Sequence, residues 1–361
     1  MNEYRGLTGL RGIAALMVFW SHVKERLAMI DGAFEPHWLF ERLFFSGGRQ
    51  VDVFFVLSGF VMTLVYHNWF VQGVTRGGYQ TFIRRRLARI YPLHVFVLLL
   101  VLGAVVVAPY VGVQMRMGAD RFTYDTLPQH FLLIHAWGLG MSEPGAWNPP
   151  SWSISIEMLA YLVFPFLLWA LLRLARRNPW LGVALTAAAG VAANLVWQWD
   201  IWGMGAIARG LTEFSLGCAT ALLMHGAAAR WLAGERGALV ALAIMAAGYA
   251  VVADTNIIIA LACAPLLLSL CGDNAASRVL GSRPLHFLGE ISYSLYLGHF
   301  FFVSLAYRLV DPVWMAGGAW QALAGGAVLT AIIIGLSTLT YYWVEVPARR
   351  WLGGARPAAH L

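Results

Sequence analysis

Long apolar segments recur along almost the whole chain and are separated by short polar stretches. Windows of about 20 residues, the length of a helix that crosses a bilayer, predict ten membrane spans. Their ranges are 8–28, 49–69, 88–108, 153–174, 180–198, 205–225, 237–253, 256–272, 286–307 and 319–343. The predicted fold class is therefore all-α, a polytopic membrane protein of about ten transmembrane helices. A further apolar run, HFLLIHAW at 130–137, is too short to span, and we expect it to form a re-entrant or interfacial helix at the outer mouth.

Composition supports the same class. Of the 361 residues 60% are hydrophobic and only 12% are charged, which excludes a soluble domain of useful size between the spans. We expect one integral membrane domain over 1–361 with no appended soluble domain. The first apolar segment has no basic region ahead of it, so it is expected to be a retained span and not a signal peptide.

The distribution of Lys and Arg residues predicts the orientation of the spans in the membrane. With ten spans and both termini cytoplasmic, about two thirds of the 25 Lys and Arg residues lie on the inner side. The net charge of +7 is explained by basic residues beside anionic lipid, so it requires no nucleic acid. We expect a multi-pass protein of the cell inner membrane whose partners include membrane lipid.

The first predicted span carries two ionisable residues, Arg11 and His22. Eleven residues of helix bring the second to within about 20° of the first while rising about 16 Å. Both side chains therefore share one helix face, and ionisable residues inside a span indicate a functional site. A cation and a titratable base so far apart suit a long anionic ligand.

Arginines also gather at the inner end of the third span, in FIRRRLARIYP at 82–92. Arg85 and Arg89 stand four apart and so lie on one helix face. The run is typical of a positive-inside topology signal. A pair of guanidinium groups is equally a phosphate site, which on this side of the membrane points to a cytosolic donor such as acetyl-coenzyme A.

The stretch NPPSWSISIEMLAY at 148–161 opens the fourth span and carries Glu157 inside its outer boundary. Counting residues from the membrane boundaries places Glu157 and His22 in the same outer half of the bilayer. A buried carboxylate needs a partner, and pairing with His22 would fix the imidazole tautomer and raise its basicity. The alternative is a packing role in which Glu157 pairs with Arg209 or with another helix.

Seven stretches, in order along the chain, identify a resemblance to the acyltransferase 3 family of integral membrane acyltransferases. They are LRGIAALMVFWSH (10–22), VDVFFVLSGFVM (51–62), RRRLARIYP (84–92), SWSISIE (151–157), RGLTEFSLG (209–217), LGEISYSLYLGH (288–299) and YYWVEVPARR (341–350). The resemblance implies ten spans, an acyl-coenzyme A donor, usually acetyl, and an extracytoplasmic hydroxyl acceptor such as a carbohydrate. The positions that match the functional residues of the family are Arg11, His22, Arg85, Arg89 and Glu157.

Several further polar and aromatic residues are candidates for binding the acceptor. Asp52 and Ser58 lie in the second span, where a helix cap and a back-bonded serine are the structural alternatives. Trp147 and Trp152 flank the outer entrance, where indole rings stack on sugar faces. His299, in the ninth span, is either a core histidine or a second base. The three cysteines, Cys218, Cys263 and Cys271, show no metal-ligand or disulfide spacing, and we expect no metal.

The resulting hypothesis is a membrane O-acyltransferase. Acyl-coenzyme A binds through Arg85, Arg89 and Arg11, and His22 with Glu157 removes the proton of the acceptor hydroxyl. Direct transfer and transfer through an acylated His22 both fit the sequence. The alternatives are a transporter or flippase that uses the same ionisable residues, and a non-catalytic membrane scaffold.

Overall fold

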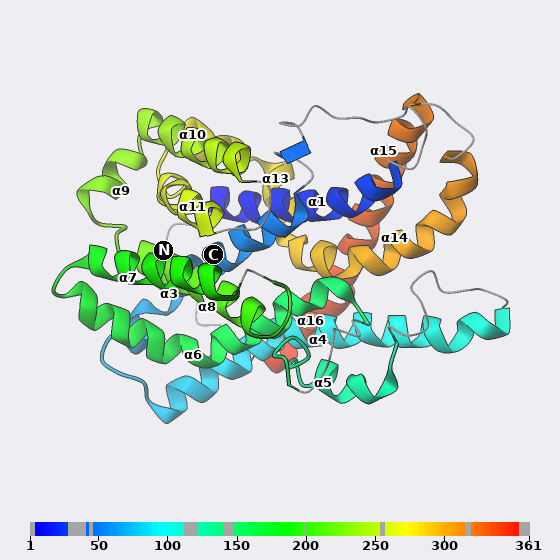
Figure 1. Ribbon diagram of the computed structural model, residues 1–361, viewed down its shortest axis with the longest axis horizontal. Coiled ribbons are helices and arrows are strands. Elements are labelled where there is room, and N and C mark those ends of the chain that lie inside the picture. The colour runs from blue at the N-terminus through cyan, green and yellow to red at the C-terminus, as the bar shows by residue number, and fades with distance from the viewer. Residues whose placement is uncertain are drawn as a thin grey trace.

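The computed structural model describes residues 4–27, 41–42, 46–111, 122–139, 147–197, 200–252, 257–314 and 319–353. Every regular element in these ranges is helical (Figure 1). The longer helices are α1 (Arg5–Leu27), α3 (Gly47–Phe70), α4 (Arg76–Val107), α6 (Trp152–Ala175), α7 (Pro179–Trp197), α8 (Gly203–Ala221), α10 (Glu235–Val251), α11 (Ile257–Ser269), α14 (Ser292–Trp314) and α15 (Ala319–Thr340).

Shorter helices connect them. They are α5 (Leu127–Phe131), α9 (Ala227–Leu232), α12 (Ala275–Leu280), α13 (Arg283–Glu290) and α16 (Val346–Leu352), with 3₁₀ turns at Ala108–Val111, Tyr124–Thr126 and Pro149–Ser151 and a π-helical turn at Tyr341–Glu345. Each of the ten predicted ranges overlaps a helix. The range 286–307 is divided at Ile291, which separates α13 from α14.

Within the described residues, five helical segments are long and apolar enough to cross a membrane. They are Gly47–Phe70, Arg76–Val111, Pro149–Ala175, Pro179–Trp197 and Ala324–Leu352, and Ile257–Ser269 is a shorter apolar helix. The predicted all-helical membrane class is confirmed at this level.

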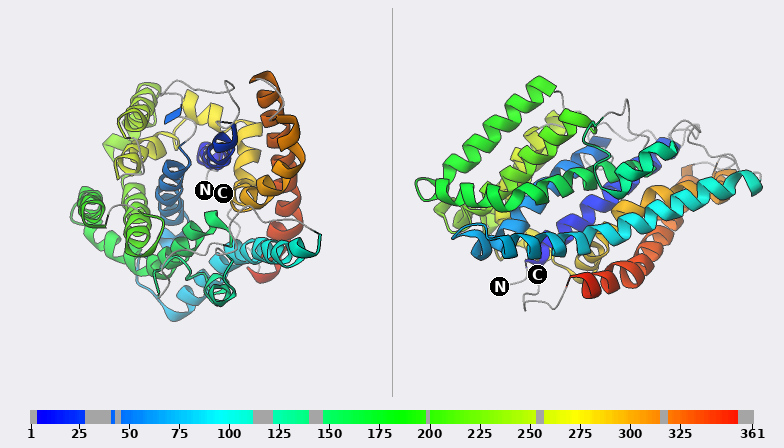
Figure 2. Two further views of the ribbon diagram at one scale, coloured as in Figure 1. Left: turned by 45° about the vertical axis from the view of Figure 1, so that its right-hand side comes forward. Right: turned by 90° about the horizontal axis from the view of Figure 1, so that it is seen from below.

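Helix α1 lies inside a ring of other helices, as the end-on view in Figure 2 shows. It packs against α3, α12, α13 and α14. Glycines allow the closest of these approaches: a Cβ atom on Gly9 would lie 1.9 Å from the carbonyl oxygen of Leu280, and one on Gly12 would lie 2.5 Å from the backbone nitrogen of Gly289. Because small residues let helix backbones approach, the helix that carries Arg11 and His22 can be surrounded on several sides.

The tightest helix pair is α3 with α8. A Cβ on Gly217 would lie 1.9 Å from the carbonyl oxygen of Val56, and one on Gly59 would lie 1.9 Å from that of Phe214. This reciprocal contact fixes the register of the two helices and so the heights of the residues on α3.

The run 130–137 does not form the expected helix. Only its first two residues belong to α5, and the rest forms turns with a positive φ of 58° at Leu133. The turns are tied to α6, where Ala136 N donates to Ser155 Oγ at 3.2 Å and the Trp137 indole donates to Ser155 O at 3.1 Å. Hydrogen bonds to a neighbouring helix therefore replace those of a local helix.

Candidate active site

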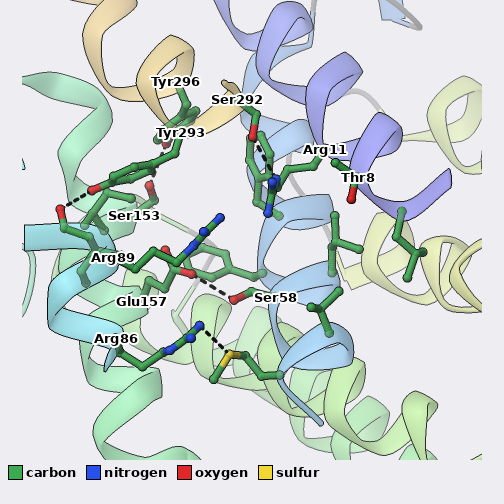
Figure 3. A pocket seen from close by; sticks show the side chains of 18 of the residues that line it. Thr8, Arg11, Ser58, Arg86, Arg89, Ser153, Glu157, Ser292, Tyr293 and Tyr296 are labelled. Carbon is green, nitrogen blue, oxygen red and sulfur yellow. Dashed lines mark hydrogen bonds between the residues drawn. The ribbon is translucent and has the colours of Figure 1, made fainter. Parts of the chain in front are cut away.

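A cavity of about 540 Å³ lies beside the N-terminal half of α1. Side chains of α3, α4, α6 and α14 point into it (Figure 3). Its polar lining consists of Tyr4, Thr8, Arg11, Ser58, Arg86, Arg89, Ser153, Glu157, Tyr161, His286, Glu290, Ser292, Tyr293, Tyr296, Tyr341 and Arg349. Arginines outnumber carboxylates in this lining, so the cavity suits an anionic ligand.

Arg11 enters the cavity from α1. Its Nη2 donates to the carbonyl of Gly289 at 2.7 Å and its Nε donates to Ser292 Oγ at 2.9 Å. These bonds tie the guanidinium to the junction of α13 and α14. α1 is continuous through both Arg11 and His22, as the shared-face argument requires.

The arginines of α4 lie on different faces. Arg86 and Arg89 line the cavity, and Arg86 donates to Tyr66 Oη at 2.9 Å. Arg85 is not in the lining; its guanidinium stacks on the ring of Trp69, 4.9 Å from the centroid. The structure therefore places Arg89 and Arg11 in the lining of one cavity, together with Arg86, whereas Arg85 lies outside this lining.

Glu157 lies in the same cavity. Its Oε1 accepts from Ser58 Oγ at 2.9 Å and from Tyr161 Oη at 2.5 Å (Figure 3). The expected pairing with His22 is not what these contacts show. The alternative partner, Arg209, is bound instead to Asp52 at 2.7 Å. Counting residues from the membrane boundaries predicts a common depth for Glu157 and His22. It does not predict which side chains on other helices each one contacts.

His22 lies beyond the cavity, about 16 Å along α1 from Arg11. Its Nδ1 lies 2.9 Å from the carbonyl oxygen of Val18, and a carbonyl only accepts, so Nδ1 carries the proton. Neutral His22 therefore has its lone pair on Nε2, as a base requires. Its ring packs 5.1 Å from that of His299 and 5.6 Å from that of Phe300.

Two aromatic rings of the cavity lining contact each other, and one of them, Tyr296, lies 6.3 Å from the ring of His299. Phe54 and Tyr296 both line the cavity and meet edge to face at 5.3 Å. The Tyr296 hydroxyl is held by Ser153 Oγ at 2.7 Å and donates to the carbonyl of Pro150 at 3.1 Å. His299 lies about one helical turn past Tyr296 on α14 and is fully buried.

The remaining predicted acceptor residues lie outside the lining, apart from Ser58. Asp52 is buried against Arg209, and Trp152 packs on the guanidinium of the same arginine at 5.1 Å. Trp147 is 1% exposed, and its indole donates to Thr126 Oγ1 at 3.0 Å. In this structure neither indole offers an open face on which a sugar could stack.

Arg349 also lines the cavity, although the sequence did not suggest it as a site residue. It follows the π-helical turn Tyr341–Glu345, an element often found at functional sites. Glu345 is buried, accepts from Ser294 Oγ at 2.5 Å and also binds the Arg349 guanidinium. The motif YYWVEVPARR could have indicated this pair, because its glutamate and arginine stand four apart and so share a helix face.

Tyr4 and Arg349 both line the cavity, so the first and last described segments of the chain meet there.

Comparison with known proteins identifies related sequences. A family model described as an acyltransferase domain, that of acyltransferase 3, matches residues 4–342. Acyltransferase MdmB of Streptomyces mycarofaciens is 30% identical over 98% of this chain and 93% of its own length. A protein of Staphylococcus aureus strain COL, provisionally named an O-acetyltransferase, is 27% identical over 59% of this chain and 30% of its own length. No solved structure matches significantly.

Proposed function

The chain belongs to the acyltransferase 3 family and is a membrane O-acyltransferase, and we propose that it moves an acyl group, typically acetyl, from cytoplasmic acyl-coenzyme A to a hydroxyl of a carbohydrate or related acceptor. The proposal includes ten spans, cytoplasmic termini and a place in the inner membrane. The observation that supports it best is the cavity that gathers Arg11, Arg86, Arg89 and Arg349 beside α1, the helix that also carries His22.

The donor binds through its negatively charged phosphates, which contact the arginines of the cavity. Guanidinium groups form paired hydrogen bonds with phosphate oxygens, and coenzyme A carries its phosphates far from its thioester. Arg86, Arg89 and Arg349 hold the phosphates toward the mouth of the cavity, and Arg11 holds the part of the donor that reaches deeper. The pantetheine arm then extends toward Phe54 and Tyr296, with the thioester beyond them at His22.

Transfer uses the lone pair on His22 Nε2. The acceptor O–H bond breaks, its proton goes to Nε2, and the oxygen forms a bond with the thioester carbonyl carbon. The C–S bond then breaks, and the departing thiolate takes up the proton from His22. The hydrogen bond from Nδ1 to Val18 keeps the ring in the tautomer that can do this. In this arrangement Glu157 orders the cavity wall through Ser58 and Tyr161, and Arg11 acts on the donor.

The test measures acetyl transfer by purified protein in lipid nanodiscs. Labelled acetyl-coenzyme A is the donor, the glycolipid and polysaccharide fraction of the cell envelope is the acceptor, and products are identified by mass spectrometry. His22→Gln should lose about 99% of turnover, because general base catalysis contributes about 10²-fold or more. His67→Gln, at the far end of α3, is the matched control and should retain activity.

Two outcomes would overturn the proposal. Full turnover by His22→Gln would remove the base assignment. In sealed vesicles, movement of labelled donor across the membrane with its thioester intact would instead favour the transporter alternative.

A further inference from the structure

The histidine next to His22 has a feature that packing does not explain. His299 is fully buried on α14, and its Nδ1 lies 2.7 Å from the carbonyl oxygen of Tyr296. Since that carbonyl can only accept, Nδ1 carries the ring proton and Nε2 holds a lone pair. His299 Nε2 is buried and has no hydrogen-bond donor among the described residues.

Such an atom is costly. A buried acceptor without a donor forfeits the hydrogen bond that it had with water, and few native groups are left in that state. A group that can gain a proton lies beside it, because the ring centroid of His22 is 5.1 Å away. At this separation the two Nε2 atoms come within hydrogen-bond range if the rings turn toward each other.

Three further aromatic rings lie around His299. Phe19 lies 6.4 Å from the His299 ring, Tyr296 6.3 Å and Phe300 6.5 Å. Among the residues for which the structure gives side chains, no carboxylate forms a hydrogen bond or ion pair with His299. The Nε2 lone pair is therefore available to a cation formed on His22.

We propose that His299 is a positioning residue for His22, and that its Nε2 accepts a hydrogen bond from the imidazolium formed when His22 deprotonates the acceptor. The acceptor proton resides on His22 Nε2, shared with His299 Nε2, until the thiolate takes it. A hydrogen bond to the charged form stabilises that form and makes His22 a stronger base. This inference rests on the proposed role of His22 as the base.

Three substitutions separate the functions of the ring. His299→Asn keeps a polar group near Nδ1 but removes the acceptor at Nε2, His299→Phe removes both, and His299→Gln places an amide oxygen near the Nε2 position. We expect kcat to fall about tenfold or more in the Asn and Phe variants while KM for acetyl-coenzyme A stays constant, and the Gln variant to recover part of the loss.

The pH profile distinguishes this role from a structural one. In the Asn variant the pH of half-maximal rate on the acid side should move about one unit lower, because His22 then holds its proton less strongly. A readout independent of turnover is the ¹⁵N spectrum of histidine-labelled protein, with the His22 signal assigned by its loss in His22→Gln. The His22 signal should titrate at lower pH in His299→Asn than in the unaltered protein. His94→Gln, which changes another buried histidine, should leave both readouts unchanged.

The outcomes are separable. If His22→Gln is inactive but the Asn and Phe variants keep the wild-type kcat, pH profile and His22 titration, the inference is wrong and the proposed function stands. A lower kcat with an unmoved pH profile and no recovery in Gln means a structural role and also overturns it. Full activity of His22→Gln would contradict the proposed function, and an unmoved ¹⁵N titration would refute the inference without reference to activity.

Discussion

The guanidinium of Arg209 on α8 donates a hydrogen bond of 2.7 Å to the carboxylate of Asp52 on α3, and both side chains are buried. A second nitrogen of Arg209 donates to the carbonyl of Gly48 at 2.7 Å. Glu213, one turn along α8, is a second buried carboxyl group that interacts electrostatically with Asp52. Two buried carboxylates beside one cation would leave an uncompensated negative charge, which is costly. We therefore expect the cluster to contain one cation and one anion, with Glu213 as the neutral acid.

This charge balance predicts different costs for two substitutions. Arg209→Gln leaves a buried carboxylate without its cation and should lower the free energy of unfolding by about 3 kcal/mol or more. Glu213→Gln replaces a neutral acid by a neutral amide of the same shape and should cost about 1 kcal/mol or less. Thermal melting of purified protein in detergent measures both. Equal destabilisation by the two variants would show that Glu213 is ionised.

The tight contact of α3 with α8 gives a second prediction. Gly217→Ala would place a methyl group 1.9 Å from the carbonyl oxygen of Val56, so the helices must separate. We expect a loss of about 2 kcal/mol or more, with lower yield of folded protein. Gly335→Ala is the matched control, because nothing lies within 4 Å of a Cβ at that position of α15. The control should be neutral or slightly stabilising, since alanine favours helix over glycine.

The sequence predicted the helices better than the identities of their neighbours. Hydropathy depends on local composition, so each of the ten ranges overlaps a helix, although 286–307 covers parts of both α13 and α14. The geometry of one helix sufficed to put Arg11 and His22 on one face. Neither hydropathy nor helix geometry could decide whether Arg85 or Arg86 enters the cavity. Both are near Arg89 along the helix, and the rotation of α4 that turns Arg86 inward is set by packing against Tyr66 and Tyr161.

Partners across helices were equally hidden from the sequence. Depth along the membrane normal can be counted from a boundary, but lateral neighbours depend on how the ring of helices closes around α1. Glu157 therefore meets Ser58 and Tyr161 and not His22, and Arg209 meets Asp52 and not Glu157. Trp147 looked interfacial by its position in the chain but is enclosed by Phe122 and Tyr124.

The arginines of α4 supply a third prediction, which sets the two assignments of the donor site against each other. Arg86→Gln should raise KM for acyl-coenzyme A about tenfold or more, because it removes a cation from the cavity lining. Arg85→Gln should leave KM within about twofold, since that side chain stacks on Trp69 outside the lining. Donor saturation curves at fixed acceptor concentration give both values. The reverse order would restore Arg85 as the donor ligand.

The last prediction concerns three stacked histidines, one on α4 and two from the segment that follows it. His135 lies between His130, with ring centroids 4.2 Å apart, and His94, with centroids 5.8 Å apart, and all three are buried. Burial lowers the pKa of His130 below its ordinary 6.5, and burial with the neighbouring histidines lowers the pKa of His135 well below 6.5.

In the unfolded chain both rings gain protons as the pH falls through about 6.5, while in the folded protein they stay neutral to lower pH. The unfolded state then binds more protons, so stability must fall as the pH drops below about 6.5, by at most about 1.4 kcal/mol per pH unit for each ring. Melting temperatures between pH 7.5 and 5.5 should therefore decrease more steeply for the unaltered protein than for the double variant His130→Gln, His135→Gln. Identical slopes would mean that the two rings do not resist protonation in the folded state.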